Sequence, residues 1–152
     1  MIPQPHKQLA ETEAANHLEL PARLTNLPHF IDFVRNQACR LDFPPKRIQE
    51  IELVLEEALV NIIKYAYPAD SPGNLTIMVT GTGESHLRIE TSDRGIPFNP
   101  LIQSDPDVEI ELMERPIGGL GILLIKELTD ELSWVRKEGK NSLTLIFAKH
   151  HA

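Results

Sequence analysis

The feature that most constrains this chain is a helix-like stretch over residues 51–68. Its apolar residues recur at spacings of three and four and form a broad stripe: Ile51, Val54, Leu55, Ala58, Leu59, Ile62 and Ile63. Glu57 and Asn61 interrupt the stripe four positions apart, so they lie one turn above the other on one side of the helix. The pair predicts either the wall of a polar pocket or an ordinary solvated helix face.

Composition limits the possible classes of protein. The 152 residues are 41% hydrophobic and 24% charged, which is typical of one globular domain with a substantial core. The formal net charge of −7 argues against a direct nucleic-acid partner. No apolar run reaches the roughly 18 residues of a membrane span, and the N-terminus lacks the apolar core of a signal peptide. We therefore expect a cytoplasmic protein with no membrane segment.

The remaining periodicities predict a two-layer α/β sandwich, in which helices cover one face of a mostly antiparallel sheet. Residues 1–15 read as a flexible arm. The predicted strands are 16–22, 75–80, 87–91, 132–136 and 142–149, and the predicted helices are 24–41, 46–67 and 122–130.

A second polar motif, Asp93-x-Gly95-x-Pro97-Phe98, follows the strand at 87–91. A carboxylate in a partly closed pocket can accept a hydrogen bond from an amino group such as that of adenine. Gly95 would let the backbone turn and a flat ring approach closely. A plain Asp-x-Gly turn is the alternative interpretation.

A third motif, Gly118-Gly119-Leu120-Gly121, is predicted to open the helix at 122–130. Free backbone N–H groups and the positive end of a helix dipole favour an anion such as phosphate. A flexible hinge between loop and helix is the alternative. The motif is neither a Walker A loop nor the dinucleotide-binding fingerprint, since no Gly-Lys-Ser/Thr follows it and no strand leads into it.

Glu57 and Asn61, the first motif, could take part in phosphate chemistry if they face a bound phosphate. The Asn61 carboxamide oxygen is a hard ligand of the kind that Mg²⁺ prefers, and Mg²⁺ often takes only one or two ligands from protein. Glu57, one turn away, could accept a proton from an attacking hydroxyl. Between the second and third motifs, residues 101–117 form an acidic, proline-containing connection that suits either a lid or a partner-recognition surface.

In this order the three motifs resemble the Bergerat-fold ATP-binding superfamily of gyrase, histidine kinases and heat-shock chaperone ATPases. The segments EEALVNIIKYAY, SDRGIPFNP and IGGLGILLIKELTDEL are similar to those of small bacterial anti-sigma-factor serine kinases of partner-switching systems. The resemblance covers residues 16–149. It implies that ATP binds between the sheet and a lid at 99–117.

The resemblance also implies individual roles. Glu57 would be the general base for the acceptor serine, and Asn61 would bind both ATP and Mg²⁺. Asp93 would hydrogen-bond the adenine amino group, with Gly95 supporting that contact. The other ATP contacts would come from Gly119, Leu120, Gly121 and a hydroxyl of the last strand, Ser142 or Thr144, of which Thr144 is included in the predicted site.

The function implied is that of an ATP-dependent serine kinase that phosphorylates an antagonist protein of the STAS type. It would also sequester a sigma factor or similar regulator, and act as a homodimer. An ATP-gated protein-binding module without kinase activity is the alternative. The catalytic domain of a split histidine kinase is disfavoured, since no phosphoacceptor helix precedes the fold in these 152 residues. Tyr65 departs from the pattern, because many relatives have histidine there; Lys64 beside it is either a phosphate contact or a surface lysine.

Overall fold

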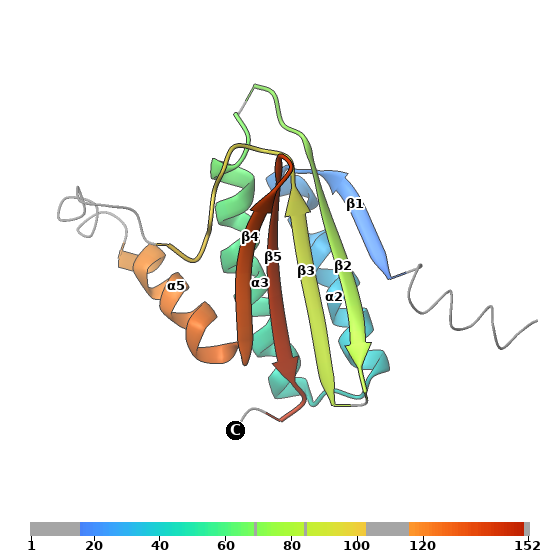
Figure 1. Cartoon of the computed structure of the whole chain (residues 1–152). Coiled ribbons are helices and arrows are strands. Elements are labelled where there is room, and N and C mark those ends of the chain that lie inside the picture. The colour runs from blue at the N-terminus through green and yellow to red at the C-terminus, as the bar shows by residue number, and fades with distance from the viewer. Residues whose placement is uncertain (1–15, 69, 84, 103–115, 151–152) are drawn as a thin grey trace, which may run out of the picture.

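The computed structural model describes residues 16–68, 70–83, 85–102 and 116–150. In chain order the elements are β1 (His17–Pro21), the 3-10 turn η1 (Leu24–Asn26), α2 (Leu27–Arg40), α3 (Pro45–Tyr65), β2 (Asn74–Thr82), β3 (His86–Asp93), α5 (Pro116–Leu128), β4 (Glu131–Lys137) and β5 (Lys140–Ala148). Figure 1 shows α2 and α3 against one face of the sheet and α5 on the β4 side. The predicted two-layer sandwich is confirmed, whereas the predicted arm at 1–15 lies outside the described residues.

The sheet has five strands in the order β1-β2-β3-β5-β4. Each neighbouring pair is antiparallel, and short hairpins join two of these pairs, β2–β3 and β4–β5. Side chains alternate between the two faces, so every second residue of β3 and β5 is buried. The buried set on these two strands is Leu87, Ile89, Thr91, Asp93, Asn141, Leu143, Leu145 and Phe147.

The helix α3 lies at the centre of the core. Ile51, Val54, Leu55, Ala58 and Leu59 on its apolar stripe are all 0% exposed. Burial of one large aliphatic side chain contributes about 1.5–3 kcal/mol, so this stripe anchors the helix to the sheet. The predicted helix at 46–67 is thus confirmed, with ends one and two residues away.

The helix α5 begins six residues earlier than the sequence suggested. It starts at Pro116, whose fixed φ suits the first turn of a helix. The glycines at 118, 119 and 121 therefore lie inside the first two turns, and do not precede the helix. Residues 103–115, which make up most of the predicted lid and carry its five acidic side chains, lie outside the described part of the chain.

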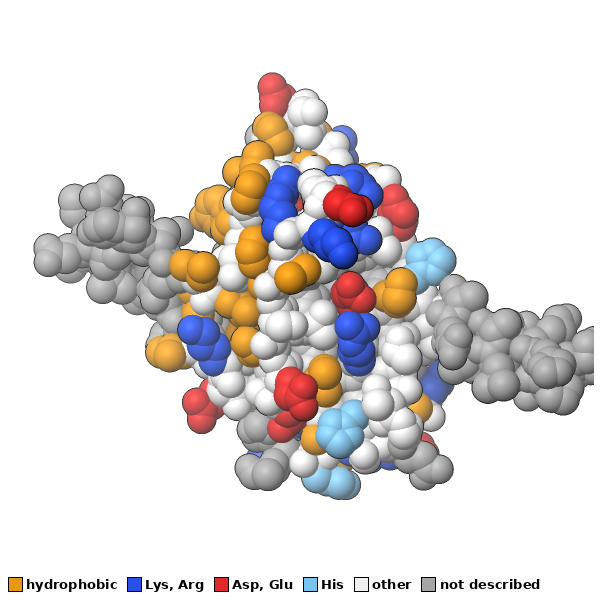
Figure 2. Space-filling model, in the orientation of Figure 1, with side chains coloured by type: hydrophobic (Ala, Val, Ile, Leu, Met, Phe, Trp, Pro, Cys, Tyr) orange, Lys and Arg blue, Asp and Glu red, His pale blue; other side chains and the backbone are white. Residues whose placement is uncertain are grey.

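The face of the sheet away from α2 and α3 carries no described helix. Figure 2 shows this face, with mostly uncharged side chains over the central strands and hydrophobic side chains gathered toward the α5 side. The most exposed large hydrophobic residues include Ile96, Ile102, Leu123 and Val135. Within the described ranges, the helices are too short or too polar to span a bilayer.

Candidate functional site

Glu57 and Asn61 lie at the edge of the buried stripe of α3, and both side chains are half-buried. Their neighbours Ala58 and Ile62 point into the core, so the two polar side chains are held one turn apart where the helix surface leaves the core. The helix fixes their relative placement without any loop.

Gly121 of α5 sits directly against Glu57. A Cβ atom built on Gly121 would lie 2.8 Å from the Glu57 Cδ atom and closer still to Oε1. Real Cβ atoms essentially never approach that closely, so any larger residue at position 121 would require the Glu57 side chain to move. The structure thereby brings the first and third motifs together across the packed pair α3 and α5.

The surroundings of Glu57 change its acidity. Burial raises the pKa of its carboxyl above the ordinary value, and the negative charge of Glu56 raises that pKa further. Desolvation disfavours the charged form of an acid, and a nearby like charge adds to the effect. A carboxyl with a raised pKa is a stronger proton acceptor than an ordinary glutamate.

The second motif reaches the same helix from the sheet. Asp93, the last residue of β3, is 5% exposed, and its Oδ1 accepts a hydrogen bond of 2.9 Å from the Gly95 N–H. A Cβ on Gly95 would lie 2.9 Å from the Ala66 Cβ, so the loop packs tightly on the end of α3. The Ile96 N–H donates to the Ala66 carbonyl at 2.8 Å. Asp93 is therefore fixed near the end of α3 that carries Asn61.

Asn141 is a residue of this site that the sequence reasoning missed. It is 2% exposed and faces Asp93 across the β3–β5 pair. Its Nδ2 donates to Asp93 Oδ1 and to the Ile96 carbonyl, both at 2.8 Å. Arg136 donates through Nη1 to Asn141 Oδ1 at 3.0 Å and to the Gly95 carbonyl at 2.9 Å. The motif loop is thus held by side chains from β4 and β5.

This network leaves one oxygen of Asp93 available. Both of the hydrogen bonds that the Asp93 carboxylate accepts from described residues end on Oδ1. Oδ2 makes none with the described part of the chain, and it is not a fully buried unsatisfied atom. A carboxylate oxygen in this state can accept a hydrogen bond from a ligand amino group.

Thr144 does not lie with Asp93. It pairs with Glu90, and strand alternation puts both residues on the sheet face away from the helices. Ser142, the other candidate hydroxyl, pairs with Ser92 on that same outer face. The structure therefore does not bring Thr144 together with Asp93, and Asn141 occupies the helix-facing position. The signal was present in the sequence, because Asn141 shares its alternation with Leu143, Leu145 and Phe147.

The remaining predicted residues fall at the start of α5 and the end of α3. Gly119 and Leu120 lie in the α5 backbone, two and one residues before Gly121. Tyr65 is 43% exposed, and its ring packs at a tilt against that of Phe98, with centroids 5.6 Å apart. An aromatic contact therefore links α3 to the segment that follows the second motif.

Comparison with known proteins identifies the family of the chain. A model of the histidine kinase-like ATPase domain family matches residues 20–147. The chain belongs to this family.

Its relatives include bacterial enzymes named serine-protein kinase RsbW. The protein from Bacillus mycoides is 31% identical over 117 residues, which cover 74% of this chain and 70% of the relative. The one from Bacillus cereus is 32% identical over the same length and the same shares. The one from Listeria monocytogenes is 28% identical over 132 residues, or 80% of each chain.

A solved structure has the same fold. It is the crystal structure of the SiaB-SiaC complex from Pseudomonas aeruginosa, with a TM-score of 0.64 and 15% sequence identity. The match covers 94% of this chain and 97% of that one. At this identity the likeness establishes the fold alone.

Proposed function

We propose that this chain is an ATP-dependent protein serine kinase that transfers the γ-phosphate of ATP to a serine of an antagonist protein. The observation that carries the proposal is the contact between Glu57 of α3 and Gly121 of α5. It puts a proton-accepting carboxylate beside the backbone of the glycine-rich helix start. Family membership and the serine-protein kinase relatives support the same function.

Glu57 would act as the general base. Its carboxylate would take the proton from the serine hydroxyl as the serine oxygen bonds to the γ-phosphorus, and ADP would leave with the electron pair of the broken P–O bond. The packing of α5 on α3 would exclude water around this carboxylate and keep it directed at the phosphate side.

Bound Mg²⁺ would neutralise the charge on the ATP phosphates. The donor set fits such an ion, because Asn61 offers one hard oxygen a single turn from Glu57 and phosphates and water can complete the shell. In the part of the chain that the structure describes, no three His, Cys, Asp or Glu side chains converge on a metal position. Asn61 would be the protein ligand, with Gly119, Leu120 and Gly121 contacting the phosphates through the first turns of α5.

The adenine end would be formed by Asp93 and Gly95. The free Oδ2 of Asp93 would accept the hydrogen bond from the adenine amino group, while Gly95 lets the loop lie flat on Ala66. Asn141 would hold the carboxylate in that orientation through its bond to Oδ1.

The partners follow from the same assignment. The phosphate acceptor would be a STAS-type antagonist, and the unphosphorylated antagonist would compete with a sigma factor or similar regulator for the kinase. We further propose that the kinase acts in the cytoplasm as a homodimer. None of these partners is itself a nucleic acid.

Transfer of labelled phosphate tests the proposal. The pure protein is incubated with Mg²⁺, γ-labelled ATP and purified candidate STAS-type proteins, and label is expected on a serine of one of them. Glu57→Ala should reduce the rate by about 10²–10⁴-fold, the usual contribution of a general base. Wild-type rates in that variant would contradict the base assignment. ATP-dependent retention of the partner without label would favour the protein-binding module.

A further inference from the structure

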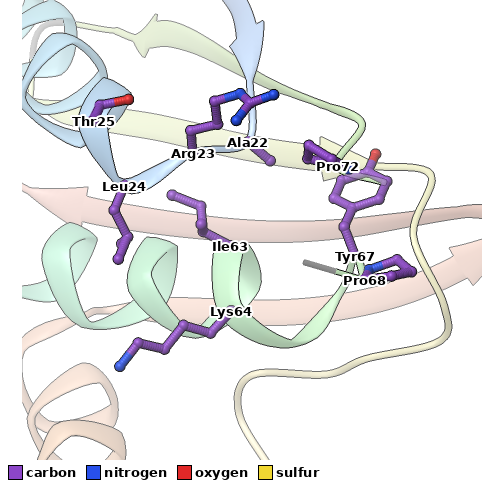
Figure 3. Close-up of a pocket in the computed structure, with 9 residues that line it drawn as sticks. All are labelled: Ala22, Arg23, Leu24, Thr25, Ile63, Lys64, Tyr67, Pro68 and Pro72. Atoms are coloured by element: carbon purple, nitrogen blue, oxygen red, sulfur yellow. The ribbon is translucent and has the colours of Figure 1, made fainter. Parts of the chain in front are cut away.

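A groove of about 420 Å³ opens between the corner that follows β1 and the last turns of α3. Figure 3 shows the residues that line it, which come from two segments far apart in the sequence. They are Ala22, Arg23, Leu24, Thr25, Ile63, Lys64, Tyr67, Pro68 and Pro72. The groove does not include Asp93 or Asn141, but Tyr67 in its wall also contacts Arg94, the residue after Asp93.

The interior of the groove is apolar. Ala22 is 3% exposed and Ile63 is 9% exposed, and the ring of Tyr67 forms part of the wall. The Tyr67 hydroxyl is already used, since it donates to the Asn74 carbonyl and accepts from the Arg94 N–H, both at 2.8 Å. Leu24 at the edge is 48% exposed. The groove therefore suits an apolar side chain and has few polar groups of its own to satisfy.

Two cations flank this apolar interior. In Figure 3, Arg23 and Lys64 extend in opposite directions from the lining, and both are exposed. Neither forms an ion pair with a carboxylate among the described residues. Two such cations on a chain with a net charge of −7 make a local site that is complementary to an acidic segment.

We propose that this groove docks an acidic segment of the antagonist protein. One apolar side chain of that segment would enter the groove, and carboxylates on either side would pair with Arg23 and Lys64. The inference rests on the proposed kinase function and names the docking surface for its protein substrate. Chemically, it requires an acidic stretch with an apolar anchor on the acceptor protein.

The position of Lys64 explains why docking here would help transfer. It is seven residues after Glu57 on one continuous helix, which is about 10 Å along the axis. A partner held at Lys64 would have its acceptor serine near Glu57 without covering the carboxylate. Docking would thus raise the effective concentration of the serine at the base.

Steady-state transfer to the labelled antagonist tests this proposal. The double variant Arg23→Glu/Lys64→Glu is expected to raise the KM for the antagonist at least about tenfold, the effect of about 1.4 kcal/mol of lost attraction. The affinity for ATP, measured by calorimetry, should stay within about twofold. Lys46→Glu is the matched control, because it reverses an exposed lysine at the other end of α3 and should leave the KM unchanged.

The outcomes separate the two proposals. Absence of label with the wild-type protein counts against the kinase function itself. Normal labelling with an unchanged KM in the double variant overturns the docking site alone. A loss of ATP affinity in Lys64→Gln would assign that lysine to the phosphates and overturn its docking role. A KM that rises only because the double variant no longer self-associates would assign the groove to a second copy of the chain.

A synthetic peptide provides a second readout that does not need transfer. The probe is a labelled peptide with one leucine flanked by four glutamates, and its counterpart has glutamines in their place. The acidic peptide should shift the NMR methyl signals of Ala22, Leu24 and Ile63, and added salt should weaken its binding. Equal binding of both peptides, or shifts confined to other surfaces, would refute the charge-based recognition.

Discussion

Polar side chains near the two ends of α3 lie in opposite environments. Near its start, Arg47 is only 3% exposed, and its guanidinium donates to several acceptors. Toward its end, Glu57 and Asn61 are half-buried and face the region where the three motifs meet. The first turn of α3 is therefore fixed by the buried, hydrogen-bonded charge of Arg47, and we call it the locked end. The later turns, with Glu57 and Asn61, leave polar atoms available to a ligand near Asp93, and we call this region the open end.

The locked end connects four parts of the fold. Arg47 bonds to Asp130 at 2.6 Å and Glu50 at 2.7 Å, and to the carbonyls of Ala148 at 2.8 Å and Leu128 at 2.9 Å. Its guanidinium also lies 5.1 Å from the ring centre of Phe147. A buried charge is tolerated only with such partners. Arg47 therefore ties the start of α3 to the ends of α5 and β5.

Removing this charge should give the largest effect on stability. Arg47→Ala removes the guanidinium that pairs with Asp130, and breaking a buried ion pair from one side costs about 3–5 kcal/mol. Urea unfolding followed by circular dichroism measures the loss. Arg35→Ala is the control, because Arg35 pairs with Asp32 and Glu52 at an exposed site, where an ion pair contributes little to stability. Equal losses in the two variants would remove the distinction between the ends of α3.

A charge-neutral change at the open end should affect binding more than stability. In Asp93→Asn, the amide oxygen must stay at the Oδ1 position to accept from Gly95 and Asn141. The amide NH₂ then points at the adenine amino group, so a donor meets a donor. Loss of a charged hydrogen bond costs about 1.5–3 kcal/mol, which is roughly ten- to a hundredfold in ATP affinity.

Calorimetry with Mg·ATP measures that loss. Glu90→Gln is the matched control, since it makes the equivalent carboxylate-to-amide change on the same strand but on the outer face of the sheet. Its ATP affinity should match that of the wild-type chain. Unchanged affinity in Asp93→Asn would show that Asp93 does not contact the base.

The local sequence pattern predicted how Glu57 and Asn61 are placed at the open end of α3. It did not predict the buried charge of Arg47 at the locked end. The apolar stripe of 51–63 specifies a buried helix, and the four-residue spacing of Glu57 and Asn61 follows from helix geometry. Arg47 gives no comparable signal. In the sequence it is a basic residue in the first turn of a helix, where the dipole disfavours it, and its partner Asp130 is 83 residues away.

The strands show the same limit. Alternation correctly predicts that β5 has one buried and one exposed face, but periodicity cannot tell which polar residue meets a particular partner on another strand. That pairing depends on the register Asp93↔Asn141, which is set by the whole β3–β5 ladder. The start of α5 was misplaced for a different reason, because the glycines at 118–121 read as helix breakers while Pro116 supports a helix start.

Asn141 and Thr144 allow a smaller test of the open end. Asn141→Ala removes one of two donors to Asp93 Oδ1 and leaves the Ile96 carbonyl unpaired. We expect about tenfold weaker ATP binding, in the range of one lost hydrogen bond to a charged group. Thr144→Ala, on the outer face, should change the affinity by less than about twofold. A larger loss of ATP affinity in Thr144→Ala than in Asn141→Ala would instead assign the ATP contact of the last strand to Thr144.

The smallest expected effect is on folding stability and comes from the raised pKa of Glu57. It tests whether this functional carboxylate lowers the stability of the fold. Burial, and then the charge of Glu56, raise the folded-state pKa of Glu57, so the native state disfavours the carboxylate. The resulting destabilisation is full above the folded pKa and disappears below the ordinary carboxyl value, since both states are then protonated. Glu57→Gln should therefore be more stable than the wild type at neutral pH, with a difference that vanishes on acidification.

The raised pKa of Glu57 should also appear in the pH dependence of phosphate transfer. Transfer needs the carboxylate form, so kcat/KM should fall as the pH drops through the raised pKa of Glu57. Glu56→Gln removes the second cause of the shift, and it should move this acid limb to lower pH while leaving the base in place. An acid limb that does not respond to Glu56 would mean that another group controls the rate. The stability difference of Glu57→Gln would then report burial alone, without a catalytic role for the carboxylate.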